Sequence, residues 1–287
     1  MIYHIIIQMQ KLKAMSFSLL CLTVSIILIL TLTFFGFANA QNNTLMEPRV
    51  IDGMATNTTN IVLIHGFWGD GSSWSKVIPI LKNAGHKVIA VQLPLHSLAD
   101  DIATTKRAVE QLGRPTILVG HSYGGFIQTN VAYNNPNVIG LVYVAGWAPE
   151  EGESLNDFVA KFPKDFLKTY DNFKPDSGGF VYISQDKFRE SFAQDVEPSE
   201  ADVMAVVQKP GHQSIFAEKS GPPAWKHLPT WYQVSENDRM IYPDVEREFA
   251  KRMNATTISL PASHASLVSH PEEIAELILN ATKESNR

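Results

Sequence analysis

Ser122 stands between two glycines in the segment Gly-His-Ser-Tyr-Gly at residues 120–124. An apolar run at residues 115–119 precedes this segment, and a helical pattern begins near Gly125. A serine at a sharp turn from strand to helix needs neighbours without side chains, because the chain segments around it pack closely. The pattern therefore predicts that Ser122 is a nucleophile at the carboxyl end of a strand. A glycine-rich turn without a chemical role is the alternative, and the flanking strand and helix favour the nucleophile.

A nucleophilic serine also needs a base and an acid that orients the base, since its hydroxyl group is weakly nucleophilic by itself. After an elbow of this kind the expected order is serine, then aspartate or glutamate, then histidine. A strand expected at 230–234 leads into a polar loop that contains Asp238, and a strand expected at 256–260 is followed by His264. We predict Asp238 as the acid and His264 as the general base.

Three neighbouring residues remain alternatives for these two roles. Glu236 lies nearer the end of its strand than Asp238, and Asp244 falls in the exposed first turn of a helix expected at 244–253. His270 competes with His264, but it lies further from the strand and directly before the last expected helix. The positions relative to the strand ends favour Asp238 and His264.

The same chemistry requires N–H donors for the negative charge that develops on the substrate oxygen. A strand near 61–64 leads into a glycine-rich loop at 65–71. We predict an oxyanion hole formed by the backbone N–H groups of Phe67, in this loop, and Tyr123, next to the serine. A dinucleotide-binding loop is the alternative. However, the glycines here follow the pattern G-x-x-G-x-G, the reverse of the nucleotide fingerprint, and no acidic residue ends the next strand.

These loops can meet only if a scaffold brings distant parts of the chain together. Short apolar runs alternate with amphipathic helical stretches, which is typical of a parallel sheet with helices on both faces. The first helix is expected at 74–84. The six expected strands lie near residues 61–64, 87–92, 116–119, 138–144, 230–234 and 256–260.

The interval 148–228 breaks this rhythm, because it is too long for one crossover and is rich in aromatic residues. We predict that it forms a cap inserted over the carboxyl ends of the strands, where ligands bind in such sheets. Residues 60–147 and 229–287 would then form the core. Trp68 and Trp147 are predicted to contact the substrate.

In combination, several segments resemble the α/β-hydrolase superfamily: residues 64–68, 93–101, 119–125, 141–145, 149–154 and 263–264. Within it, the chain is similar to the branch of small bacterial esterases, plant methylesterases and hydroxynitrile lyases, over about residues 60–282. The resemblance implies an α/β-hydrolase fold and a Ser122, Asp238 and His264 triad that works without metal or cofactor.

Two positions depart from the lyase members of that branch. In those members a threonine follows the first histidine of the oxyanion loop and a lysine follows the catalytic histidine, whereas this chain has Gly66 and Ala265. A lyase must stabilise a departing cyanide, so the missing cation favours hydrolysis. We therefore expect a serine carboxylesterase that cleaves a small-molecule ester through an acyl-enzyme. A C–C lyase or hydrolase, and a ligand-binding receptor with slow turnover, are the alternatives.

The first 40 residues have a different character. Two lysines precede an apolar run at 17–37, and small residues at 38 and 40 precede Gln41. This pattern predicts a secretory signal peptide, although the run is also long enough for an uncleaved membrane anchor. Either reading predicts export, so we expect a secreted or extracytoplasmic domain. Residues 41–59 are expected to be a linker.

Composition agrees with one catalytic domain. The chain has 287 residues, of which 45% are hydrophobic and 18% are charged. Without residues 1–40 the 24 basic residues lose two lysines, and the net charge becomes 22 minus 29, or −7. No basic stripe is expected to bind nucleic acid or an anionic membrane. The single cysteine, Cys21, lies in the leader, and no pattern indicates the oligomeric state.

Overall fold

The computed structural model describes residues 58–285, and the centre of this region is a parallel sheet. Its six strands are arranged in the order β2-β1-β3-β4-β8-β9. The predicted fold class, including six parallel strands, is confirmed. The strands are β1 (Asn60–Ile64), β2 (Val88–Ala90), β3 (Thr116–His121), β4 (Val138–Val144), β8 (Thr230–Ser235) and β9 (Thr256–Leu260).

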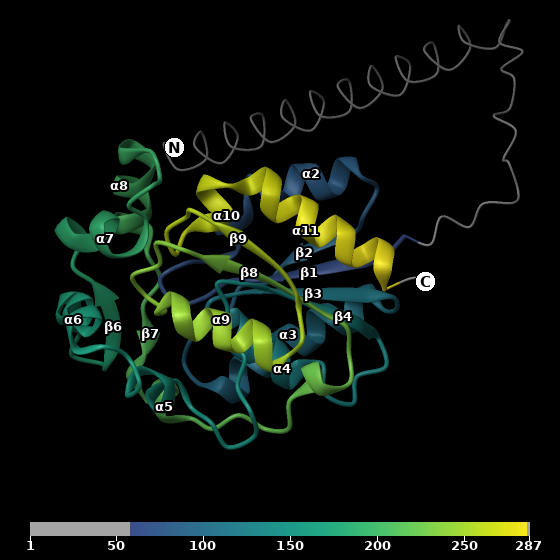
Figure 1. The fold of residues 1–287 in the computed structure, drawn as a ribbon, viewed down its shortest axis with the longest axis horizontal. Helices are drawn as coiled ribbons and strands as arrows, with labels where there is room; N and C mark the ends of the chain where they lie inside the picture. Colours follow the sequence, from purple (N-terminus) through teal and green to yellow (C-terminus); the bar gives the residue numbers. More distant parts are fainter. Residues whose placement is uncertain (1–57, 286–287) are drawn as a thin grey trace, which may run out of the picture. The chain divides into compact units, whose positions relative to one another are not determined.

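Helices cover both faces of this sheet, as the alternating pattern of the sequence predicts. Figure 1 shows α2 and α11 on one face and α3, α4 and α9 on the other. These helices are α2 (Val77–Asn83), α3 (Leu98–Leu112), α4 (Tyr123–Val131), α9 (Pro243–Arg252) and α11 (Pro271–Glu284), and a short α10 (Ser266–Ser269) precedes α11.

Two helices begin elsewhere than the sequence suggests. Instead of one helix at 74–84, a 3-10 turn η1 (Gly71–Trp74) comes before α2. The Asp70 side chain accepts a hydrogen bond from Ser72 N–H and forms a capping box with Ser73, which starts this turn early. Helix α4 begins at Tyr123 rather than near Gly125, so it follows Ser122 directly.

The segment between β4 and β8 forms a separate layer, which Figure 1 shows at one end of the sheet. Its strands β5, β6 and β7 pair in an antiparallel sheet of their own. Backbone hydrogen bonds from Trp68 N–H to Lys209 O and from His212 N–H to Leu95 O join this layer to the loops after β1 and β2. The elements are α5 (Leu155–Val159), α6 (Lys164–Leu167), η2 (Lys168–Asn172), β5 (Phe173–Pro175), β6 (Phe180–Ile183), α7 (Gln185–Phe192), α8 (Pro198–Val207), β7 (Gly211–His212), η3 (Gln213–Ala217) and η4 (Ala224–Lys226).

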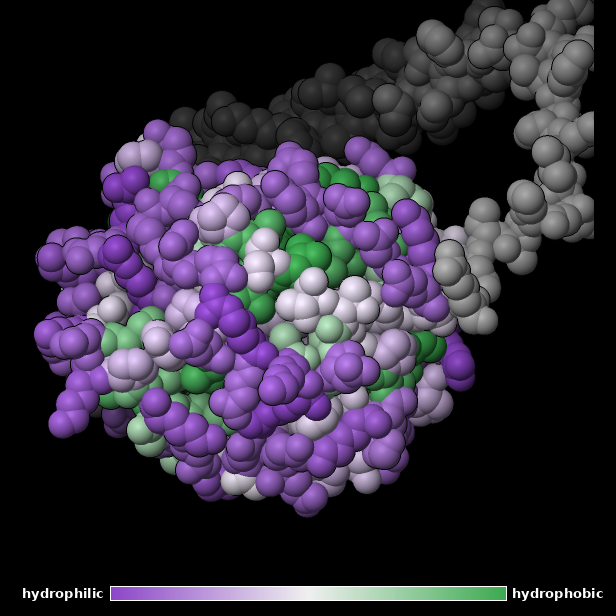
Figure 2. All heavy atoms as spheres, in the orientation of Figure 1, coloured by the Kyte–Doolittle hydropathy of each residue, from purple (hydrophilic) through white to green (hydrophobic). Residues whose placement is uncertain are grey.

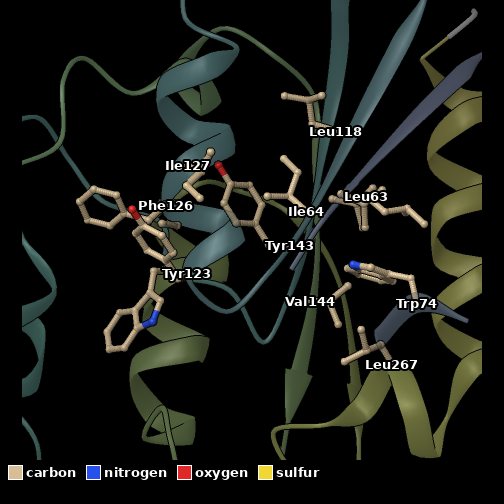
Figure 3. Close-up of a cluster of buried hydrophobic side chains, with 14 of the residues drawn as sticks. Leu63, Ile64, Trp74, Leu118, Tyr123, Phe126, Ile127, Tyr143, Val144 and Leu267 are labelled. Atoms are coloured by element: carbon tan, nitrogen blue, oxygen red, sulfur yellow. The ribbon is translucent and has the colours of Figure 1, made fainter. Parts of the chain in front are cut away.

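The hydrophobic core lies on both sides of the central strands. Figure 3 shows Tyr123 and Phe126 from α4 on one side of the strands and Trp74 and Leu267 on the other. All residues of β1, β3 and β8 are buried, whereas the edge strand β9 is mostly exposed. Burial on two faces gives the central strands little freedom to move, so the loops at their ends start from fixed positions.

The surface of the described residues is mostly polar on the face shown in Figure 2. Figure 2 shows a mostly hydrophilic face, with apolar side chains at the surface between α11 and β9. Among residues 58–285, no helix combines the length and the apolar character needed to cross a membrane. The predicted leader at 1–40 and the linker residues 41–57 lie outside the described residues.

Candidate active site

Ser122 occupies a strained turn between β3 and α4. Its φ of 53° and ψ of −123° are unusual for a residue with a side chain. A Cβ atom added to Gly120 would lie 2.5 Å from the Gly124 carbonyl carbon, and one added to Gly124 would lie 2.3 Å from Ile64 O. The two glycines are therefore a steric requirement of the turn, which places Ser122 at the carboxyl end of β3.

His264 and Asp238 are brought together by the loops after β9 and β8. His264 Nδ1 lies 2.5 Å from Asp238 Oδ2, and both side chains are fully buried. The other oxygen, Asp238 Oδ1, accepts hydrogen bonds from Met240 N–H at 2.6 Å and Ile241 N–H at 2.8 Å. Because a carboxylate only accepts hydrogen bonds, His264 Nδ1 carries a proton. In the neutral ring, Nε2 is then the atom that can take a proton from a nucleophile.

His264 Nε2 is buried and has no hydrogen-bond partner within residues 58–285. The His264 ring lies against His121, with 4.7 Å between centroids, and His121 Nε2–H donates to His264 O at 2.8 Å. Burial lowers the pKa of His121 well below its usual range, so this ring is neutral. The residue before Ser122 thus ties the nucleophile strand to the loop that holds His264.

The alternative acids and base have other partners. The carboxylates of Glu236 and Asp244 both pair with Arg247, and the side chain of Asp244 is 66% exposed. His270 Nδ1 lies 2.9 Å from Ser269 Oγ. Of the five candidates, the structure joins only Asp238 and His264 to each other within the described region.

The predicted oxyanion loop runs directly against the nucleophile. A Cβ atom on Gly66 would lie 2.5 Å from Ser122 Cβ and 2.9 Å from Ser122 Oγ. The next residue is Phe67, and Tyr123 is the first residue of α4, where a backbone N–H has no partner within the helix. Both predicted donors therefore belong to backbone next to Ser122.

A model of the alpha/beta hydrolase family matches residues 61–277. The chain belongs to this family. This hydrolase is 27% identical to a pyrethroid hydrolase of Sphingobium wenxiniae over 250 residues, which are 77% of this chain and 86% of that protein. It is 24% identical to polyneuridine aldehyde esterase of Rauvolfia serpentina over 258 residues, 79% of this chain and 96% of that one. The crystal structure of a pyrethroid hydrolase from Sphingobium faniae has the same fold, with a TM-score of 0.69 at 24% identity, over 80% of this chain and 100% of that one.

His65 fixes the oxyanion loop of the hydrolase, a role that sequence reasoning missed. Its Nδ1–H donates to Gly66 O at 2.8 Å, and its Nε2 accepts from Leu93 N–H at 3.0 Å. Burial lowers the pKa of His65 to about 4, so the ring is neutral at neutral pH and keeps an acceptor for Leu93. The side chain thereby links the loop after β1 to the loop after β2.

Asp101 holds the side chain of Tyr123, the residue after Ser122. Its Oδ2 accepts from the Tyr123 hydroxyl at 3.1 Å, and its Oδ1 accepts from Leu95 N–H at 2.8 Å. Asp101 is fully buried, and burial raises its pKa to about 6. One sequence signal could have located it: Asp101 lies three residues after Leu98 and four before Thr105, on the helix face that is buried.

The two tryptophans predicted to contact substrate lie in different surroundings. The Trp68 ring is part of an aromatic layer with Phe192, whose ring lies 4.9 Å from that of His264. Trp68 also lines a cavity of about 220 Å³. The Trp147 ring stacks on Phe158 at 5.5 Å, in an aromatic cluster between α5 and α9.

The site is closed, and it contains no cluster suited to a metal. Ser122 is only 4% exposed, and Phe192 of α7, in the segment between β4 and β8, lies against the His264 ring. Within residues 58–285, the His, Cys, Asp and Glu side chains form no group of three or more that could hold a metal ion.

Proposed function

We propose that this α/β hydrolase is a carboxylesterase that cleaves small-molecule esters through an acyl-enzyme. The buried Asp238–His264 pair carries the proposal, because it leaves Nε2 of the imidazole without a partner among the described residues, and the ring lies against His121, the residue before the strained Ser122. The named relatives are a pyrethroid hydrolase and an esterase, which supports ester hydrolysis over other reactions of this fold.

The geometry suggests a sequence of proton transfers. His264 Nε2 takes the proton of Ser122 Oγ while the oxygen attacks the ester carbonyl carbon. The N–H groups of Phe67 and Tyr123 stabilise the resulting oxyanion, and the imidazolium gives its proton to the leaving alcohol. Water then attacks the acyl-enzyme by the same route and releases the acid. Asp238 remains a carboxylate and stabilises the imidazolium in both steps.

The residues above the site favour an apolar substrate. Phe192 covers His264, and Phe67 stacks on Phe216 of η3 with 5.0 Å between centroids. Because Ser122 is 4% exposed, substrate entry requires the layer between β4 and β8 to move. In that open state we propose that Trp68 contacts the substrate directly. The Trp147 ring is 5% exposed, so its contact requires α5 to shift as well.

The side chains that a lyase of this branch would use are absent from the site. Gly66 has no space for a side chain beside Ser122, and Ala265 is fully buried and offers no cation.

We also propose that the hydrolase is exported. Support comes from the apolar run at 17–37 and the small residues before Gln41. Expression in a host with a general secretion pathway, followed by amino-terminal sequencing, is expected to give a mature protein that starts at Gln41. Recovery of only full-length, membrane-bound chain would support an anchor instead.

The esterase proposal is tested with aryl esters of increasing acyl length and with an organophosphonate probe. We expect rapid turnover, a covalent adduct that maps to Ser122 by mass spectrometry, and a loss of several orders of magnitude in Ser122→Ala. Ser259→Ala, on the exposed strand β9, is the matched control and is expected to keep full activity. Turnover that survives in Ser122→Ala contradicts the proposal, and Ser122-dependent cyanide release from mandelonitrile would identify a lyase.

A further inference from the structure

Glu246 is a buried carboxyl group behind the proposed acid. It lies in the first turn of α9 and has no exposed surface, which is rare for a glutamate without a cation as partner. Its Oε2 accepts a hydrogen bond from Ser235 N–H at 2.9 Å. The next residue, Arg247, pairs with Glu236 and Asp244 at the surface. A cation therefore does not explain the burial of Glu246.

The second oxygen of Glu246 has no donor of its own in the described part of the chain. Glu246 Oε1 is buried and receives no hydrogen bond from a donor within residues 58–285. Asp238 N–H donates to Ser235 O in the same turn that Glu246 Oε2 contacts, and the Asp238 carboxyl lies close enough to the Glu246 carboxyl for a hydrogen bond between them. Two ionised carboxylates cannot form such a bond, because neither has a proton to donate. One of the two carboxyl groups must therefore be protonated.

The surroundings decide which group holds the proton. Asp238 accepts hydrogen bonds from Met240 N–H, Ile241 N–H and His264 Nδ1–H, so both of its oxygens already face donors. Glu246 accepts only the one from Ser235. Burial raises the pKa of Glu246 well above its usual range, and the adjacent charge of Asp238 raises it further.

Other titratable groups around the pair do not change this assignment. Glu236 is a further negative charge near Glu246 and also disfavours its ionisation. Tyr232 donates its hydroxyl proton to Gly146 O at 2.8 Å, and Tyr170 donates to Met240 O at 2.6 Å. Both tyrosines have a raised pKa, so they stay neutral next to the carboxyl pair.

We propose that Glu246 is a positioning residue that stays protonated during turnover and donates its carboxyl hydrogen bond to Asp238. Asp238 then accepts hydrogen bonds from two backbone N–H groups, from the His264 ring and from the Glu246 carboxyl. These donors hold Asp238 as a carboxylate in a single orientation toward His264. The effect of Glu246 on catalysis rests on the proposed esterase function, whereas the protonation state of Glu246 does not.

Two substitutions separate this role from simple packing. Glu246→Gln keeps the shape, an N–H donor for Asp238 and an acceptor for Ser235 N–H. Glu246→Met keeps the approximate volume but removes the donor. Without that donor, Asp238 becomes a stronger acceptor and stabilises the imidazolium form of His264 more. The acidic limb of the kcat/KM profile should therefore move to higher pH, because the neutral imidazole that acts as base forms only at higher pH.

The experiment combines infrared spectra with pH profiles of aryl ester hydrolysis. At neutral pH we expect a carbonyl-stretch band of a buried carboxylic acid that Glu246→Gln removes. The pH profile of Glu246→Gln should resemble that of the wild type, with kcat within about threefold. In Glu246→Met, the acidic limb of the profile should move to higher pH by about half to one pH unit, and kcat should fall by about tenfold. Glu248→Gln, exposed on the same helix, is the control and should retain the band and the profile.

Each outcome is decisive. An acid band that persists in Glu246→Gln, or an acidic limb of that variant that moves strongly to lower pH, would mean that Glu246 is ionised and would overturn the proposal. Unchanged rates and profiles in Glu246→Met would reduce Glu246 to a packing role, which also overturns it. If Glu246→Met does not fold, the infrared comparison still decides the protonation state. A protein without esterase activity would defeat the proposed function, while the infrared result would stand by itself.

Discussion

The loops on the two sides of Ser122, the proposed nucleophile, are stabilised by different electrostatic means. On the base side, Asp238 accepts two backbone N–H groups and the His264 ring, so a permanent negative charge is held beside the imidazole. On the oxyanion side, neutral His65 bridges Gly66 and Leu93. In the proposed mechanism, the base side stabilises a positive charge that forms during the reaction, whereas the oxyanion side fixes backbone donors.

The two sides also differ in the pKa values of their buried groups. The buried groups of the oxyanion side, His65 and Asp101, have pKa values of about 4 and about 6. On the base side, the pKa of Glu246 is raised well above its usual range. His65 and Asp101 therefore change charge in acidic solution, whereas Glu246 keeps its proton to a higher pH than an ordinary glutamate. Burial thus acts in opposite directions on the two kinds of group: it lowers the pKa of the histidine and raises the pKa of the two carboxyl groups.

The largest effect is expected from removing the charge on the base side. Asp238→Asn should lower kcat by about 10³- to 10⁴-fold, since the amide nitrogen cannot accept the Nδ1 proton of His264. Asp101→Asn should lower kcat by about tenfold at most, because Asp101 contacts the Tyr123 hydroxyl and Leu95 N–H rather than the reacting atoms. Single-turnover rates with an aryl ester measure both. Equal losses in the two variants would contradict the distinction between the two sides.

A steric change on the oxyanion side should have the next largest effect. Gly66→Thr should lower kcat by about 10²- to 10³-fold, because the new Cβ would lie 2.5 Å from Ser122 Cβ and would displace the loop with its N–H donor. The control is Gly178→Ala, where the closest atom to a new Cβ lies 3.4 Å away. Retained activity in Gly66→Thr would show that the loop can move without loss of the oxyanion hole.

His65 should make the fold sensitive to acid. Its pKa is about 4 in the fold and 6.5 without burial, so the unfolded chain binds more protons between these values. The free energy of unfolding should then fall by up to about 3 kcal/mol as the pH drops from 6.5 to 4. Urea unfolding of the wild type and His65→Gln measures this contribution, which the variant should lack. His227→Gln, at an exposed histidine, should keep it.

Asp101 should contribute with the opposite sign and a slightly smaller size. Its pKa is about 6 in the fold against 3.8 without burial, so the folded state holds the extra proton. The stabilisation is present below pH 3.8 and is lost as the pH rises through 6. Relative to the wild type, Asp101→Asn should therefore gain up to about 3 kcal/mol in unfolding free energy over this range. Calorimetry at several pH values checks this, and Asp202→Asn, at an exposed site, should show no such gain.

Much of the fold could be predicted because its signals are local. Apolar runs spaced by amphipathic stretches predicted all six strands of the central sheet, and both ends of β4 and β9 agree with the structure. The start of the first helix was wrong, because a capping box at Asp70 begins a separate turn before it. Such a cap competes with helix continuation through hydrogen bonds that the apolar pattern does not report.

The candidate site could be predicted only in part. Asp238, Glu236 and Asp244 lie within nine residues of one another, so position along the chain separates them poorly. Glu246 looks like an ordinary acidic residue of an amphipathic helix, and nothing in its neighbours indicates full burial. The contact between Glu246 and Asp238 depends on how α9 packs against the end of β8, which is a long-range property of the fold.

The sequence alone determined the Ser122 turn, because the requirement for glycine at 120 and 124 is a local steric effect of a strand that turns into a helix. It also determined the family and the order of the candidate residues along the chain. Only the tertiary structure decided which carboxyl group meets His264 and which carboxyl group lies behind it. The reason is that hydrogen bonds and desolvation act through space, between residues that the fold brings together from separate strands and helices.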